Sequence, residues 1–352
     1  MTAAFAGRRR FFATGRSQVV DEHDRALWDA LTDQAEGGKG VRPLVLQRVY
    51  AALGGQQPEL AATVGGAVEL LHTAFVIHDD VIDDDDHRRG RPNVRGTFTA
   101  AAEPAGVEAG RARRYGDTAA ILAGDLALAG AVREMATCGA RPGVVADLLD
   151  LLEEVLHRSA AGELADVRVS LLGNASVADA LDIAEWKTAA YSFQLPLQAG
   201  AILAEADEGV VTALGEVGRT LGIAYQLRDD VHGVFGTREE TGKDPLGDLR
   251  EGKCTALVAV ARSTRHWDAL APHVGDPDLT PRGAAHARDL LIACGARQAV
   301  ETSIADLRTS ALTTATTLPR PAAEAVTSMI ELFVPTSSHL AGHGPGPGAR
   351  HR

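Results

Sequence analysis

The sequence predicts an all-α protein built as one single-domain helical bundle. Apolar residues recur with helical periodicity nearly throughout, and no stretch alternates with period two for long enough to form a convincing strand. Aromatic residues make up only 4% of the 352 residues and Ala is abundant, which favours helices over sheets. We therefore expect a helical domain over 21–335, a basic flexible arm over 1–20 and a disordered Gly/Pro-rich tail over 336–352.

The segment AATVGGAVELLHTAFVIHDDVID (61–83) is the most apolar helix that the sequence predicts. Because it is apolar almost all round, we expect it to be buried. After its acidic end, residues 88–116 contain no clear periodicity and are predicted to form one long loop. A loop of that length in a compact protein is usually functional or mobile.

Two later helices carry recognisable end signals. Ser176 is placed as an N-cap with Asp179 three residues on, an approximate capping box. Thr280 is placed as the cap of another helix, with Pro281 at the first helical position and Gly295 as the stop.

Charge and cysteine content limit the possible functions. The formal net charge of −12 makes the protein a poor candidate for binding nucleic acid. Its three cysteines lie far apart without metal-ligand spacing, which fits a reduced, cytoplasmic compartment. The stretch GRRRFF (7–12) is not followed by the apolar region of an export signal. No uninterrupted apolar run approaches the roughly 20 residues that cross a bilayer, so no transmembrane segment is expected.

Residues 79–86 place six aspartates in eight positions, at the end of the apolar helix. Asp79 and Asp83 are four residues apart and share a helix face, and Asp80 lies three residues before Asp83. Like charges at this spacing repel one another, and burial strengthens the repulsion. A hard divalent cation with oxygen ligands is the natural compensation, and Mg²⁺ combines one or two carboxylates with phosphate oxygens. The alternative interpretation is a solvated acidic helix end.

A second apolar helix, GIAYQLRDDVHGVFG (222–236), also runs into paired aspartates, Asp229 and Asp230. Gln226 lies one turn before Asp230 on the same face. One such motif is weak evidence, but two on separate buried helices predict two clusters that face each other across a cavity and hold metal ions.

Several local basic groups accompany these aspartates: Lys39, Arg42, Arg88, Arg89, Lys187, Lys243 and Lys253. Each one alone is most simply a solvated surface cation. Together they describe a site where cations and metals surround phosphate groups. Because the sequence contains no GxxxxGK[ST] motif, ordinary nucleotide hydrolysis is not indicated.

These motifs, in this order, resemble the trans-isoprenyl diphosphate synthases, the polyprenyl synthetase family. The resemblance runs from about residue 20 to about residue 330 and is carried by GGKGVRP, LLHTAFVIHDDVIDDDDHRRGRP, AAILAGDLALA, AGELADV, KTAAYSFQLPLQAGA, GIAYQLRDDVHGVFG and GKDPLGDLREGKCT. It implies a helical bundle of the isoprenoid synthase type around a deep central cavity, working as a homodimer. It also implies that isopentenyl diphosphate condenses with an allylic diphosphate (dimethylallyl, geranyl or farnesyl) and that pyrophosphate is released.

The resemblance implies a role for each matching position. Three Mg²⁺ ions, bound with the substrate diphosphate, would be held by Asp79, Asp80, Asp83, Asp229 and Asp230. The allylic diphosphate would be contacted by Arg88, Lys187, Thr188, Gln226, Lys243 and Lys253. Isopentenyl diphosphate would be held by Lys39, Arg42, His72 and Arg89. Arg88 and Lys187 join the five aspartates in the implied catalytic set.

The length of the product is expected to depend on residues below Asp79 on its helix. Phe75 lies one turn, roughly 5.4 Å, below Asp79, with the small Ala74 beside it and Leu71 deeper on the wall. One large and one small residue indicate geranylgeranyl diphosphate (C20), with farnesyl diphosphate (C15) as the alternative. The other interpretation of Phe75 is plain core packing.

Three positions depart from the family pattern. Gly40 stands where an arginine is common, Gly233 stands where a third aspartate is common in the second motif, and His232 has no assigned role. Two other functions stay open, a terpene cyclase on the same fold and a non-catalytic partner subunit. The groups assigned to isopentenyl diphosphate disfavour the cyclase, and the intact aspartates at 79, 80 and 83 disfavour the partner subunit.

Overall fold

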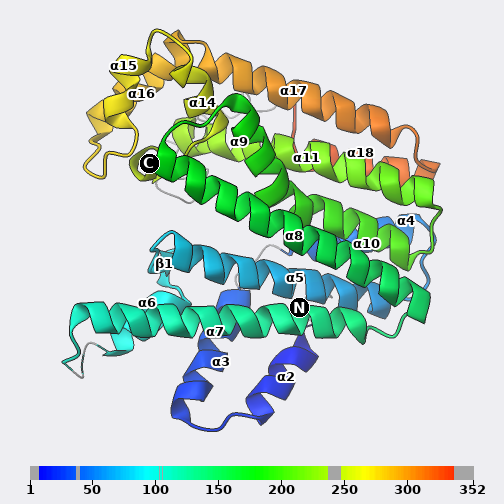
Figure 1. Ribbon diagram of the computed structural model, residues 1–352. Helices are drawn as coiled ribbons and strands as arrows, with labels where there is room; N and C mark the ends of the chain where they lie inside the picture. Colours follow the sequence, from blue (N-terminus) through cyan, green and yellow to red (C-terminus); the bar gives the residue numbers. More distant parts are fainter. Residues whose placement is uncertain (1–7, 37–39, 103, 105, 237–246, 337–352) are drawn as a thin grey trace, which may run out of the picture.

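The computed structural model describes residues 8–36, 40–102, 104, 106–236 and 247–336, and it is almost entirely helical over these ranges. The all-α fold class is thereby confirmed. Figure 1 shows long helices stacked side by side, with α5, α7 and α8 in neighbouring positions and α11 beside α17. The sequence therefore folds as one bundle, with the helices that carry the two acidic clusters inside it.

The helices and strands follow one another without a second architecture. Those of the first half are α2 (Arg9–Ser17), α3 (Glu22–Glu36), α4 (Val41–Ala52), α5 (Pro58–Ile82), β1 (His87–Arg88), β2 (Arg91–Pro92), α6 (Val94–Ala102), α7 (Ala109–Ala136) and α8 (Pro142–Leu172). Those of the second half are α9 (Val177–Ile183), η2 (Ala184–Gln194), α10 (Leu195–Leu203), α11 (Glu208–Phe235), α13 (Gly247–Glu251), α14 (Ala256–Arg262), α15 (Trp267–Leu270), η3 (Ala271–His273), α16 (Pro281–Ala293), α17 (Ala296–Ala315) and α18 (Arg320–Phe333).

Helix α5 lies at the centre of the first half of the bundle. It packs along α7 and also contacts α3, α4 and η2, and most of its residues are buried, as its apolar sequence predicts. By length and composition α5 is the one helix of the described chain that is apolar enough to cross a membrane, but 72% of its most apolar window is buried inside the protein. That degree of burial is typical of a core helix.

The segment predicted as a flexible arm over residues 1–20 is helical where the structure describes it. Helix α2 packs Phe11 against Trp28 of α3, with ring centroids 5.3 Å apart, and Gly15 lies so close to the Trp28 ring that a Cβ there would meet it at 2.1 Å. These apolar contacts, absent from a periodicity count over so short a segment, order the helix. Residues 1–7 and 337–352 lie outside the described residues.

The prediction of one long loop over 88–116 is wrong. A short hairpin, β1 with β2, is followed by α6 and then by the start of α7. The hairpin turns through Arg89 and Gly90, both at positive φ (55° and 75°), as a two-residue turn of this kind requires. Helix α6 packs closely on α7, where a Cβ on Gly116 would lie 2.5 Å from the carbonyl oxygen of Arg95. Tertiary packing thus supplies what the local sequence does not signal.

The predicted helix caps are confirmed. The Ser176 side chain accepts from the backbone N–H of Asp179, and the Asp179 carboxylate accepts from that of Ser176, which completes the capping box. Thr280 caps α16 and Pro281 opens it. Gly295 follows the end of that helix in the left-handed conformation, at φ 79°.

Candidate active site

Two cavities flank the end of α5 that carries the aspartates. The larger, about 840 Å³, lies between α3, α5 and the hairpin. The smaller, about 160 Å³, lies between α5, α8, η2, α11 and the segment after α13. Arg88 lines the larger cavity and bonds to aspartates at the edge of the smaller one, so it lies where the two sites adjoin.

Asp79 and Asp83 of α5 both line the smaller cavity, whereas Asp80 is turned inward and is only 1% exposed. Arg88 donates through Nε to Asp80 (2.7 Å) and through Nη2 to Asp79 (3.2 Å). Burial raises the pKa of Asp80 to about 6, although Arg88 opposes that shift. Burial also raises the pKa of Asp83, and the neighbouring Asp79 adds to this shift. The repulsion expected from the spacing is therefore real, and Arg88 offsets only part of it.

The remaining aspartates of the run have a structural role. Arg95, only 2% exposed, donates to Asp84, to Asp86 (2.9 Å) and to Asp117 of α7 (2.6 Å). One buried guanidinium thus ties the end of the acidic run to α6 and α7. The six aspartates divide into a group at the smaller cavity and a group that fixes the turn.

Lys187 joins the first acidic cluster to helix α8. Its Nζ lies 2.8 Å from Asp166, 3.0 Å from Glu163 and 3.2 Å from Asp79. Burial alone would lower the pKa of Lys187, but the three carboxylates outweigh it and raise the pKa above its ordinary value. Lys187 is therefore held charged at the edge of the cavity.

The sequence interpretation missed Glu163 and Asp166, although they lie within the motif AGELADV. Their position depends on close packing of α8 against η2, a helix with i→i+5 hydrogen bonds. A Cβ on Gly162 would lie 2.5 Å from the backbone nitrogen of Lys187. Only glycine at this position therefore lets α8 approach closely enough for its two carboxylates to meet Lys187. The three-residue spacing of Glu163 and Asp166 was the available signal.

The second cluster reaches the same cavity through α11. Thr188 donates to the Gln226 carbonyl (2.9 Å), and Gln226 donates to Asp230 (2.8 Å). Burial raises the pKa of Asp230 to about 7, partly offset by the Gln226 hydrogen bond. Asp230 lines the cavity with Lys253, whereas Asp229 is exposed and is not among the lining residues.

The two departures in the second motif have different outcomes. Gly233 is occupied from outside its own helix, because a Cβ there would lie 2.1 Å from the carboxylate of Asp248 on α13. The carboxylate of Asp248 therefore fills the space of the side chain that Gly233 lacks. Nothing in the structure explains the choice of His232.

Lys253 completes the rim of the smaller cavity. Its Nζ lies 2.8 Å from Glu251 and 3.9 Å from Asp83. Burial would lower the pKa of Lys253, but the hydrogen bond and charge of Glu251, together with Asp83, raise it above its ordinary value. Lys243 falls outside the described residues, as does Lys39.

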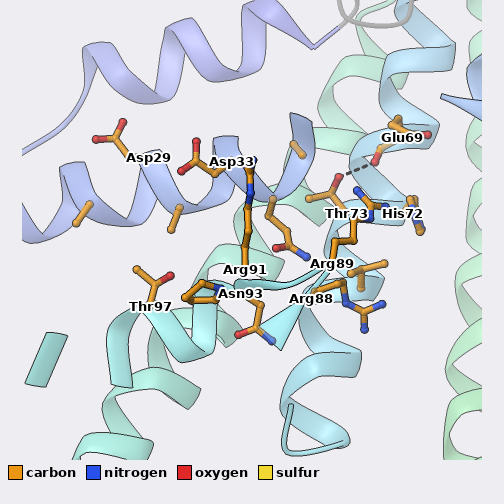
Figure 2. A pocket seen from close by; sticks show the side chains of 16 residues that line it. Asp29, Asp33, Glu69, His72, Thr73, Arg88, Arg89, Arg91, Asn93 and Thr97 are labelled. Carbon is orange, nitrogen blue, oxygen red and sulfur yellow. Dashed lines mark hydrogen bonds between the residues drawn. The ribbon is translucent and has the colours of Figure 1, made fainter. Parts of the chain in front are cut away.

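His72, Arg88 and Arg89 line the larger cavity, and Figure 2 shows them together. Burial lowers the pKa of His72 well below its ordinary value, and Arg42, Arg89 and Arg88 lower it further. The imidazole is therefore neutral among three guanidinium groups. A buried, neutral histidine beside several arginines is the expected arrangement of an anion-binding site.

Tyr191 of η2 connects the residues that precede Asp79 with Arg42. Its ring stacks on His72 at 5.9 Å and meets Phe75 edge-on at 5.0 Å. The Arg42 guanidinium lies 4.9 Å from the ring centroid and donates to Ser192 at 2.8 Å. The sequence interpretation gave Tyr191 no role, although it lies in a motif that carried the resemblance. Gly40 precedes these groups in the left-handed conformation, at φ 62°.

The three residues proposed to limit product length do not share one environment. Phe75 packs with the core cluster that contains Leu71, whereas Ala74 is fully buried in another cluster with Trp28 and Leu31. Phe75 is therefore the one of the pair that lies beside Tyr191, and its effect on product length stays a prediction.

The donor set fits Mg²⁺ bound together with a diphosphate. Asp79, Asp83 and Asp230 bring carboxylate oxygens to one cavity, and Oδ2 of the buried Asp80 has no hydrogen-bond partner among the described residues. In the part of the chain that the structure describes, no group of three or more His, Cys, Asp or Glu is close enough to hold a metal ion alone. Such a site suits a cation that takes its other ligands from phosphate oxygens and water.

Comparison with known proteins agrees with this geometry. The family model for polyprenyl synthetase matches residues 25–277. The chain belongs to the polyprenyl synthetase family. A geranylfarnesyl diphosphate synthase from Aeropyrum pernix is 34% identical over 69% of this chain and 73% of its own length. A geranylgeranyl diphosphate synthase from Sulfolobus acidocaldarius is 34% identical over 63% of this chain and 62% of its own.

Solved structures show the same polyprenyl synthetase fold. A geranylgeranyl pyrophosphate synthase from Corynebacterium glutamicum, complexed with isoprenyl diphosphate and magnesium, superposes with a TM-score of 0.86 at 28% identity, covering 94% of this chain and 98% of that one. A polyprenyl synthase from Caulobacter crescentus, complexed with calcium and isoprenyl diphosphate, gives a TM-score of 0.75 at 29% identity over 95% and 94% of the two chains. The described acidic cavity thus lies within a fold that binds a divalent metal and a prenyl diphosphate in these relatives.

Proposed function

We propose that this polyprenyl synthetase condenses isopentenyl diphosphate with an allylic diphosphate and releases pyrophosphate. The observation that carries the proposal is the smaller cavity, where Asp79 and Asp83 of α5 face Asp230 of α11. Lys187 and Lys253 stand beside these carboxylates as fixed cations. An arrangement of this kind serves a substrate whose diphosphate becomes the leaving group.

The chain's own residues prepare the departure of that group. Three Mg²⁺ ions, bound by the aspartates and the diphosphate, would neutralise the negative charge that develops on the leaving pyrophosphate. Lys187, Lys253 and Arg88 reach the same cavity and exchange their present carboxylate contacts for phosphate oxygens when substrate binds. Because they are already in place, they stabilise the developing charge without reorganisation of solvent.

The larger cavity would receive isopentenyl diphosphate. Arg42, His72 and Arg89 supply its donors, and neutral His72 offers one N–H without adding charge. The double bond of isopentenyl diphosphate then attacks the allylic cation, and a proton is lost. Since no side chain in either cavity is placed as a base, the departing pyrophosphate accepts that proton.

The product we favour is geranylgeranyl diphosphate, with farnesyl diphosphate as the alternative. The relatives carry names of synthases for geranylgeranyl, geranylfarnesyl and farnesyl diphosphates. Incubation of the purified chain with Mg²⁺, isopentenyl diphosphate and each allylic primer, read by mass spectrometry, tests both the activity and the length. Release of a cyclic hydrocarbon without use of isopentenyl diphosphate would instead indicate a terpene cyclase. No turnover with any primer would indicate a non-catalytic partner subunit.

A homodimer in the cytoplasm is part of the same proposal. Helices α7 and α8 both carry exposed apolar side chains: Ile121, Leu122, Leu164, Leu171 and Leu172. Exposed apolar groups on neighbouring helices are typical of an interaction surface. Sedimentation equilibrium of the purified chain measures the assembly directly.

Replacing Arg42 by alanine is expected to raise KM for isopentenyl diphosphate about tenfold or more, because a charge-assisted contact to phosphate is lost. KM for the allylic substrate should change little, since Arg42 does not line the smaller cavity. Steady-state kinetics with each substrate varied in turn separates the two effects. A rise confined to the allylic constant would show that the two sites are assigned the wrong way round.

Replacing Phe75 by alanine is expected to lengthen the product by one or more isoprene units. The smaller side chain removes the edge-on contact with Tyr191 and opens space one turn below Asp79. Chromatography of the dephosphorylated products measures the length distribution, and the first condensation should keep most of its rate. An unchanged distribution would assign Phe75 to plain core packing. Ala74→Phe is expected to shorten the product, but because Ala74 is fully buried its folding must be checked first.

A further inference from the structure

The basic segment at the start of the chain has no place in the proposed mechanism, yet one of its arginines is buried. Arg8 is only 4% exposed and donates through Nη1 to the carbonyl oxygen of Ala35 at 2.7 Å. Ala35 lies in the last turn of α3, and the next described residues after that helix are Gly40 and Arg42. Arg8 therefore fixes the end of the helix that leads to the residues assigned to isopentenyl diphosphate.

A buried glutamate faces the same place from α5. Glu69 is only 3% exposed, and its Oε2 has no hydrogen-bond partner among the described residues. Burial lowers the pKa of Arg8, and Glu69 is the leading charge that opposes this shift. Two opposite charges removed from water must compensate each other, because an uncompensated buried charge is costly.

Both ends of this arrangement form part of the wall of the larger cavity. Ala35 and Glu69 line it together with His72 and Arg89, and Figure 2 shows Glu69 one turn from His72 on the same helix. Thr73 donates to the Glu69 carbonyl at 2.9 Å, as the dashed line in Figure 2 marks. A change in the charge balance at Glu69 is therefore felt where the diphosphate would bind.

We propose that Arg8 is a positioning residue for the isopentenyl diphosphate cavity, which it serves by holding Ala35 and by balancing the buried carboxylate of Glu69. The inference rests on the proposed function. Without Arg8, the wall of an anion-binding cavity would carry an unbalanced negative charge, and the end of α3 would lose its anchor. The smaller cavity, on the far side of Arg88, would be unaffected.

The test compares KM for the two substrates in four variants of the full chain. Arg8→Ala is expected to raise KM for isopentenyl diphosphate about tenfold and to leave the allylic KM and kcat within about twofold. Arg8→Lys keeps the charge without the guanidinium fork, so its KM should lie between wild type and Arg8→Ala. The double variant Arg8→Ala with Glu69→Gln should recover at least part of the loss, since the unbalanced charge is gone.

Arg10→Ala is the matched control for the docking of α2. Arg10 donates to Glu134 at 3.0 Å and to Thr137 at 2.6 Å, so its loss loosens α2 from α7 without changing the charge beside Glu69. It should leave KM for isopentenyl diphosphate near that of wild type. An equal rise in Arg10→Ala and Arg8→Ala, an equal rise in both substrate constants, or a double variant no better than Arg8→Ala would each overturn the inference.

Folding and activity are checked separately. If Arg8→Ala does not fold, Arg8→Lys still carries the test, and a KM for isopentenyl diphosphate equal to wild type in that soluble variant overturns the inference. Wild-type protein that does not consume isopentenyl diphosphate would sink the proposed function itself. Wild-type turnover without a substrate-specific change in the Arg8 variants would sink only the role of Arg8.

Discussion

Replacing Asp79 by asparagine is expected to lower turnover by about 10²–10³-fold or more, the largest effect of any single aspartate in the chain. Asp79 lines the smaller cavity and lies within contact of both Arg88 (3.2 Å) and Lys187 (3.2 Å). The neutral side chain keeps the shape but removes a ligand from the cations that stabilise the leaving group. Steady-state kinetics at saturating substrates and Mg²⁺ measures the loss.

Asp85→Asn is the matched control, because Asp85 belongs to the same acidic run but is exposed and does not line the cavity. Its turnover should stay within a few-fold of wild type. A chelator should abolish wild-type activity and added Mg²⁺ should restore it. Full turnover in chelator, or equal losses in the two variants, would contradict a metal site at Asp79.

The second cluster provides a related comparison. The sequence assigned Asp229 and Asp230 the same role, whereas in the structure Asp230 lines the cavity and Asp229 is exposed. The motif alone states that two carboxylates follow one another. Which of them faces the cavity depends on the rotation of α11 against η2, and this is fixed by glycines such as Gly222, where a Cβ would lie 2.4 Å from Ala189.

Much of the site followed from spacing along single helices. Asp79 and Asp83 share a face because they are one turn apart, and the hydrogen bond from Gln226 to Asp230 follows from the same spacing on α11. The residues that were missed act between helices. Glu163 and Asp166 meet Lys187 only because Gly162 lets α8 approach η2. No periodicity within one helix contains that information.

The fold shows the same division. The apolar run of α5 and the capped starts of α9 and α16 were readable because their signals are local. Helix α6 was missed, since its formation depends on contact with α7 and on the three aspartates that Arg95 gathers. Likewise α2 owes its order to Trp28 of the next helix.

Replacing Lys187 by methionine is expected to lower turnover by about 10²–10³-fold and to destabilise the folded chain by about 1–3 kcal/mol. Methionine keeps most of the side-chain length but removes the charge that Asp79, Glu163 and Asp166 share. Three partly buried carboxylates would then face one another without a fixed cation. Thermal unfolding and steady-state kinetics on the same preparation measure the two losses.

The two losses have different causes and can be separated. Adding Asp166→Asn to Lys187→Met removes one of the repelling carboxylates, so stability should return toward wild type while turnover stays low. Lys187→Arg keeps the charge and should retain the stability, but its planar guanidinium matches the three carboxylates differently and should lower turnover to a lesser extent. If the double variant regained activity together with stability, Lys187 would serve only to neutralise α8, and the contact of Lys187 with the allylic diphosphate would have to be abandoned.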